Sequence, residues 1–166
     1  MGHDARVIRG AGLEWERVAR GDRFGWRRKG LAAAAGGAML GCSLYEIPAG
    51  RRSFPYHYHC ANEEGIYVLE GKGSIRLGRR AVRIAAGDYI LLPVGPGGSH
   101  QVVNTSRRPL RYLCFSTMRQ PEICVYPESK KVGLMEGEAA TGRRRGLRRF
   151  RFVRPGPDLD YWDGEV

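Results

Sequence analysis

Three of the four histidines in this sequence lie within 44 residues and could surround a metal ion. His57 and His59 are two residues apart, so in an extended strand both imidazoles face the same side. Glu64 follows after four residues, and His100 lies further along the chain. Neutral imidazoles with one carboxylate suit a borderline divalent ion, and the low thiol content nearby argues against a zinc–thiolate site. We therefore expect these four residues to bind one metal ion.

Ordinary structural roles compete with this interpretation. A single histidine in a strand usually packs or faces solvent, and a His-x-His pair alone is a weak signal. Tyr56 and Tyr58 flank His57 and by alternation face the opposite side, where packing is the simpler role. Asn104 shares the parity of His100 but ends a strand, where asparagine commonly forms a turn. We therefore name no catalytic residue from the sequence.

Bringing His100 back to the histidine pair requires a sheet that folds over on itself. From residue 39 onward, short strand-like runs alternate with Gly, Pro, Asn and Arg-Arg positions, a pattern typical of a sandwich or barrel. Gly71-Lys72-Gly73 is expected to form a hairpin turn, because glycine readily takes a positive φ. The expected strands cover residues 40–47, 54–60, 65–70, 74–77, 81–84, 89–92, 100–104 and 110–117.

The length and composition indicate one all-β domain with short extensions. The chain has 166 residues, 42% of them hydrophobic, and its 24 glycines and 9 prolines favour turns over long helices. We expect an irregular N-terminal extension over residues 1–38, a β-barrel over 39–127, and a C-terminal basic linker with an acidic, aromatic tail over 128–166. No run approaches the ~20 apolar residues of a membrane span.

The net charge of +11 raises the question of nucleic-acid binding, but the charge distribution argues against it. Seven arginines lie between Arg143 and Arg154, so the rest of the chain carries only +4. Nucleic acid would also require stacking aromatic residues among these arginines, and Phe150 and Phe152 supply only two. We expect a small-molecule ligand as the partner, rather than nucleic acid or a membrane.

The cysteines indicate a reducing compartment. No Cys-x-x-Cys pair occurs among Cys42, Cys60, Cys114 and Cys124. We expect free, buried thiols and a cytoplasmic protein. Export is the alternative, because Arg27-Arg28-Lys29 precedes an apolar run and Cys42, as in a twin-arginine signal with a lipoprotein cysteine. The apolar run is short, and residues 39–47 alternate like a barrel strand, which favours the cytoplasm.

Two spacings resemble the sequence motifs of the cupin superfamily. The first runs Gly50, six residues, His57-x-His59, four residues, Glu64, six residues and Gly71. The second runs Gly87, five residues, Pro93-x-Gly95, four residues, His100, three residues and Asn104. One extra residue before His57, and four residues rather than two between Gly95 and His100, depart from the pattern. Both departures fall in expected loops, and the resemblance to small single-domain, conserved-barrel cupins covers roughly residues 39–118.

The resemblance implies a double-stranded β-helix, or jelly roll, with His57, His59, Glu64 and His100 around one divalent ion in the barrel mouth. The spacing to Gly71 selects Glu64 over Glu63, which strand parity would turn away from the metal. The family also suggests a homodimer. Iron, manganese, nickel, zinc and cobalt all remain open, because imidazole and carboxylate groups accept each of them.

Four protein ligands on a six-coordinate ion would leave two positions for dioxygen or a bidentate anion. We therefore expect a metal-dependent enzyme that acts on a small anionic or oxygen-rich metabolite by oxygenation, isomerisation or decarboxylation. The alternative is a non-catalytic cupin that binds or senses a metal or small ligand, because one fold serves several functions.

Overall fold

Antiparallel strands dominate the chain, in agreement with the expected all-β class. The structure is a computed structural model that describes residues 6–137 and 147–165. Its strands are β1 (Glu16–Arg20), β2 (Phe24–Gly30), β3 (Leu40–Ile47), β4 (Tyr58–His59), β5 (Glu64–Glu70), β6 (Lys72–Leu77), β7 (Arg80–Ala85), β8 (Tyr89–Leu92), β9 (His100–Val103), β10 (Leu110–Thr117), β11 (Glu122–Tyr126), β12 (Lys131–Gly137) and β13 (Leu147–Val153). The helical turns in these residues are η1 (Gly10–Gly12), α1 (Leu31–Ala34) and η2 (Pro96–Gly98), and none is long and apolar enough to cross a membrane.

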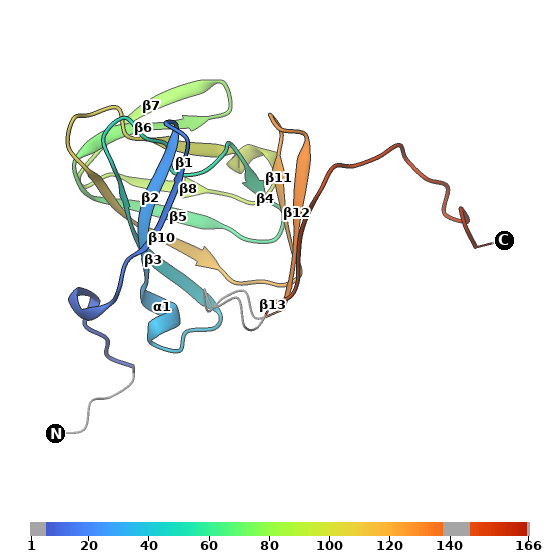
Figure 1. Ribbon diagram of the computed structural model, residues 1–166, viewed down its shortest axis with the longest axis horizontal. Helices are drawn as coiled ribbons and strands as arrows, with labels where there is room; N and C mark the ends of the chain where they lie inside the picture. The colour runs from blue at the N-terminus through green and yellow to red at the C-terminus, as the bar shows by residue number, and fades with distance from the viewer. Residues whose placement is uncertain (1–5, 138–146, 166) are drawn as a thin grey trace.

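Two groups of strands face each other and form the barrel (Figure 1). One sheet has the order β1-β2-β3-β10-β5-β8, and the opposing strands have the order β7-β6-β9. A further sheet, β13-β12-β11-β4, lies at one end of the barrel, where Figure 1 shows β11 and β12 side by side. The arrangement is the double-stranded β-helix expected from the sequence.

The apolar core lies between the sheets and comes from alternate positions along the strands. Ile66 and Val68 of β5 are almost fully buried, whereas Tyr67 between them is 40% exposed. A one-residue slip of β5 would exchange these faces, so burial fixes the register of the strand that begins with Glu64. The core residues are Ile47, Ile66, Val68, Ile75, Ile84, Leu92, Val102, Leu110 and Tyr112.

Gly71 forms a corner between sheets, and the expectation of a hairpin turn is wrong. β5 pairs with β10 and β8, whereas β6 pairs with β7 and β9, so the strands on either side of Gly71 belong to different sheets. The φ angle of Gly71 is 85°, and a Cβ at this position would collide with the carbonyl oxygen of Pro109. Positive φ at glycine permits both a hairpin and a corner, and only strand pairing distinguishes them.

The two extensions are more regular than expected. β1 and β2 continue the large sheet beside β3, and β12 and β13 continue the end sheet beside β11. The buried carboxylate of Glu46 lies 2.7 Å from both Arg27 and Arg111, which ties β2 to β3 and β10. The sequence predicted irregular structure for the N-terminal extension and a linker with a tail for residues 128–166, whereas strand pairing includes β1, β2, β12 and β13 in the sheets.

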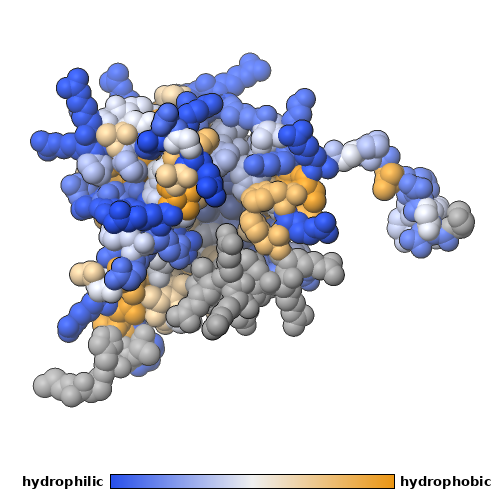
Figure 2. Space-filling view, in the orientation of Figure 1, coloured by the Kyte–Doolittle hydropathy of each residue, from blue (hydrophilic) through white to orange (hydrophobic). Residues whose placement is uncertain are grey.

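The strands β12 and β13 carry exposed apolar side chains. Figure 2 shows apolar atoms gathered over β12 and β13, where Leu134, Phe150 and Phe152 are partly exposed. Beyond β13 the chain runs away from the barrel (Figure 1). Arginines 143–145 of the expected basic segment lie outside the described residues.

Asn104 holds the connection between β9 and β10. Its side chain is fully buried, and its amide nitrogen donates to the carbonyl oxygens of Ile47 at 2.9 Å and Arg108 at 2.8 Å. Its amide oxygen accepts from the backbone nitrogen and the hydroxyl of Ser106, both at 2.9 Å. Asn104 is therefore a turn-forming residue, the simpler of the two roles considered from the sequence.

Replacing Asn104 with alanine should lower the free energy of unfolding by about 2–4 kcal/mol, because the carbonyl groups of Ile47 and Arg108 lose this donor and Ser106 loses its acceptor. Urea denaturation followed by circular dichroism would measure this change. Arg107→Ala, at an exposed position of the same turn, is the control and should change stability by less than about 0.5 kcal/mol. Equal stability of the two variants would contradict the role assigned to Asn104.

Candidate metal centre

His57, His59, Glu64 and His100 converge on one cavity from separate parts of the barrel. His59 ends β4, Glu64 begins β5 and His100 begins β9. His57 forms a β-bridge with His100, with backbone N–O distances of 3.1 and 2.8 Å. All four side chains line a cavity of about 320 Å³. The fold therefore brings side chains that are far apart in the sequence to a single point.

The carboxylate of Glu64 lies among the imidazoles. Its Oε2 is 3.3 Å from Nε2 of His59 and 3.5 Å from Nε2 of His100. The ligand atoms of His57, Glu64 and His100 all lie within 4.8 Å of one another, so this group could hold a metal ion. Glu63 is exposed, in agreement with the parity argument that selected Glu64.

Backbone carbonyls fix the orientation of two imidazoles. Nδ1 of His57 lies 2.8 Å from the carbonyl oxygen of Pro55, and Nδ1 of His100 lies 2.9 Å from that of Gly98. Because a carbonyl can only accept, Nδ1 carries the proton in both rings and Nε2 keeps a free lone pair. Metal-binding histidines commonly make this hydrogen bond, so the two rings fit a metal ion in tautomer and direction.

Burial keeps His57 and His100 neutral. It is the main cause that lowers the pKa of His57 to about 3, and the neighbouring His100 adds to the effect. Burial also lowers the pKa of His100, although Glu64 opposes the shift. Neutral imidazole is the form that binds a metal, so these two side chains need lose no proton at neutral pH.

His59 behaves differently because two carboxylates flank it. Burial would lower the pKa of His59, but Glu122 and Glu64 outweigh burial and raise it to about 10. Burial likewise opposes the ionisation of Glu64, yet contact with His59 lowers the pKa of Glu64 to about 2. Without a metal, the site therefore holds an imidazolium between two carboxylates. A metal ion that binds His59 must displace this proton.

Glu122 of β11 is a residue of this site that sequence analysis missed. Its buried carboxylate accepts from the backbone nitrogens of Cys60 at 3.1 Å and Ala61 at 3.3 Å, and from the side-chain amide of Asn62. Nδ1 of His59 lies 3.6 Å from Oε2 of Glu122, slightly too far for a hydrogen bond, and is buried without another partner. Glu122 is thus held in place to face the outer nitrogen of His59. The alternation of Glu122, Cys124 and Tyr126 after Pro121 was the available sequence signal.

The remaining candidates occupy other surroundings. Tyr56 is buried and the guanidinium of Arg76 lies 4.1 Å from its ring centroid, so Tyr56 packs away from the cavity as expected. All four cysteines are free, as expected, but only Cys124 is buried and Cys60 is exposed. The expectation of four buried thiols is therefore only partly correct, because Cys60 lies in the connection after β4 and Cys42 and Cys114 are only partly buried.

In the metal-free protein, nitrogen NMR of labelled histidine should show His59 still protonated at about pH 8 and His57 neutral at about pH 6. The pKa of His100 should lie below the usual value of ~6.5, because burial lowers it. Replacing Glu122 with glutamine should lower the pKa of His59, because one flanking charge is lost. Glu128→Gln removes an exposed carboxylate and is the control. Titration of His59 near pH 6.5 in the unaltered protein would contradict this charge arrangement.

Comparison with known proteins agrees with the fold. Residues 43–116 match the family model of the cupin domain. An uncharacterized protein of Methanocaldococcus jannaschii is 34% identical over 70 residues, which are 42% of this chain and 54% of that protein. Quercetin 2,3-dioxygenase of Bacillus subtilis is 31% identical over 100 residues, which are 58% of this chain and 29% of that enzyme. The matched chain thus spans about half of the first relative and less than a third of the second.

A solved structure extends the agreement over nearly the whole chain. The sugar phosphate isomerase of Silicibacter pomeroyi, itself described as a cupin, superposes with a TM-score of 0.75. The match covers 93% of this chain and 97% of that protein at 23% identity, a level that shows the fold alone. Residues 43–116 therefore match the cupin domain, and the chain shares the fold of that solved cupin structure.

Proposed function

We propose that this protein is a metal-dependent enzyme that binds one divalent ion with His57, His59, Glu64 and His100. The observation that carries the proposal is the convergence of these imidazoles on the half-buried carboxylate of Glu64 inside a cavity, with two Nε2 atoms freed by backbone hydrogen bonds. When bound, such an ion would supply Lewis-acid or dioxygen-binding chemistry at its open positions. Homodimer formation and a cytoplasmic location stay predictions from the sequence.

Arg28 supports an anionic substrate. It lies on β2, opposite Tyr45 of β3, and on the same side of the strand as Trp26, which packs against the core. Arg28 lines the 320 Å³ cavity together with the proposed ligands, and also a neighbouring cavity of about 190 Å³ that shares Glu64. Its Nε is buried without a hydrogen-bond partner, and the exposed Glu16 carboxylate lies 3.8 Å away. A ligand oxygen could satisfy this donor.

The charges around the cavity also favour an anion. A divalent ion with Glu64 and three neutral imidazoles carries a net charge near +1, and Arg28 and Glu122 offset each other. In a cavity of low dielectric this charge attracts a carboxylate, an enolate or a phosphate more strongly than it would in water. Sugar phosphates combine such a charge with several oxygen atoms, and oxygenation, isomerisation and decarboxylation all proceed on substrates of this class. We therefore propose a small anionic, oxygen-rich metabolite as the substrate.

A non-catalytic binding or sensing role is the second candidate. Beyond the proposed ligands, the titratable cavity residues include Tyr45, Tyr112 and Tyr126. Burial is the main cause that raises the pKa of each of these three phenols, so they are poor proton donors and acceptors at neutral pH. Catalysis would then depend on the proposed metal ion and on the small molecule bound to it.

Replacing His59 with alanine should reduce the metal content far below one ion per chain, because an incomplete ligand set binds weakly. Elemental analysis of protein purified without chelators or nickel affinity would measure it, and circular dichroism would confirm that the barrel persists. Tyr58→Phe, at the neighbouring position of β4, is the control and should keep its metal. Stoichiometric metal in folded His59→Ala protein would contradict the ligand assignment.

Malonate should perturb the visible spectrum of the cobalt(II) protein at lower concentrations than dimethyl malonate, because only the acid carries the charge that the site favours. Replacing Arg28 with glutamine should raise the malonate concentration for half-maximal change by about tenfold, as expected for loss of a charge-assisted hydrogen bond. Arg20→Gln on the exposed strand β1 is the control. Equal responses to acid and ester would favour a neutral ligand.

A further inference from the structure

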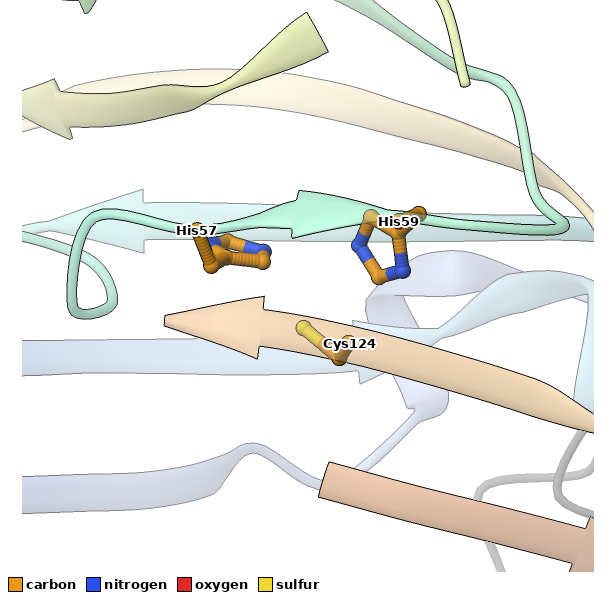
Figure 3. Close-up of side chains that lie close together, drawn as sticks. All are labelled: His57, His59 and Cys124. Atoms are coloured by element: carbon orange, nitrogen blue, oxygen red, sulfur yellow. The ribbon is translucent and has the colours of Figure 1, made fainter. Parts of the chain in front are cut away.

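Cys124 faces the proposed metal centre from a strand that lies outside the residues matching the cupin domain. It belongs to β11, where its Cα is the register partner of His59. Figure 3 shows the ring of His57 just before β4, the ring of His59 on β4, and the sulfur of Cys124 directed toward them from β11. The ligand atoms of these three residues all lie within 4.8 Å of one another.

The position of Cys124 is not that of an ordinary core cysteine. Its side chain is 1% exposed, but it lines the metal cavity with the imidazoles instead of packing into the apolar core. Glu122 and Tyr126 on either side along β11 also belong to the surroundings of the histidines, since Tyr126 stacks on His57 with ring centroids 5.7 Å apart. The whole inward face of β11 is thus directed at the proposed metal centre.

We propose that Cys124 is a further ligand of the metal centre and supplies a thiolate beside His57 and His59. This inference rests on the proposed metal-binding function. Coordination replaces the S–H bond by a metal–sulfur bond, and the released proton passes to solvent, so no oxidant or reductant is required. His57 is common to the sulfur-containing group and to the group with Glu64 and His100, so the two groups adjoin at this imidazole.

A thiolate ligand changes which metal ions the site prefers to bind. Thiolate is a soft ligand that favours zinc, cobalt or nickel over manganese or magnesium, whereas imidazoles and a carboxylate alone discriminate less. It also takes one of the two coordination positions that the four expected ligands would leave for substrate. The sequence expectation of a thiol-free site would then be wrong, because the cysteine is remote from the histidines along the chain.

Cobalt(II) titration of the full-length protein tests the proposal. The unaltered protein should bind one cobalt ion and show a sulfur-to-cobalt charge-transfer band in the near ultraviolet. Cys124→Ser should bind cobalt without this band. It should also bind zinc at least ~10-fold more weakly, since even changes outside the first coordination shell cost that much. Manganese affinity should stay about the same, because manganese gains little from a thiolate.

Two other cysteines provide matched controls. Cys60→Ser removes an exposed thiol next to β4 and should leave the band intact. Cys114→Ser removes the nearest rival, because the sulfur of Cys114 lies 3.6 Å from Oε1 of Glu64. Loss of the band in Cys114→Ser, with its retention in Cys124→Ser, would overturn the assignment.

The outcomes separate this inference from the proposed function. One bound cobalt ion without the band in the unaltered protein would overturn the role of Cys124 and leave the His and Glu ligands standing. Failure to bind any metal would overturn both. If Cys124→Ser did not fold, X-ray absorption of the unaltered cobalt protein would still decide the question, because sulfur in the first coordination shell supports the proposal and its absence overturns it.

Discussion

The burial of charge around Glu64 is the constraint on which the rest of this site depends. A carboxylate removed from water is costly unless it is paired or bound by a cation. Here it lies within 3.3–3.5 Å of two imidazole nitrogens, and Glu122 brings a second buried carboxylate to His59. Without a metal, protonated His59 neutralises part of this charge. A divalent ion would take over that role, so metal and proton compete for one position.

Connecting segments, as well as strands, fix the orientation of the histidine rings in the site. Carbonyl groups of Pro55 and Gly98, both in connecting segments, set the tautomers of His57 and His100. Gly98 sits in the short turn η2, where a Cβ would collide with the carbonyl oxygen of Pro93. The turn before β9 therefore requires glycine, and the same turn orients the histidine two residues later. The extra residues by which these connections depart from the cupin motifs leave this geometry intact.

Segments outside the domain match complete the cavity. β2 contributes Arg28 and is tied to the barrel by the Arg27–Glu46–Arg111 cluster, whose buried carboxylate needs both guanidinium partners. β11 contributes Glu122 and Cys124 from the opposite end of the chain. The histidine and glutamate set lies within the domain match, whereas the groups beside it come from these strands. The charge beside the histidine and glutamate set, and the metal preference that we propose, thus depend on strands outside the domain match.

The sequence alone determined the barrel, the course of most strands and the convergence of His57, His59, Glu64 and His100, because period-two alternation and motif spacing are local properties. The bounds expected for residues 40–47, 89–92 and 110–117 agree with β3, β8 and β10. The role of the three histidines and Glu64 as metal ligands stays a prediction. Only the tertiary structure decided that Gly71 turns a corner, since the pairing partners of β5 and β6 lie far away in sequence. It also decided that Arg28 and Cys124 line the cavity and that Glu122 faces His59, because these residues reach the site through long-range strand pairing that no local pattern encodes.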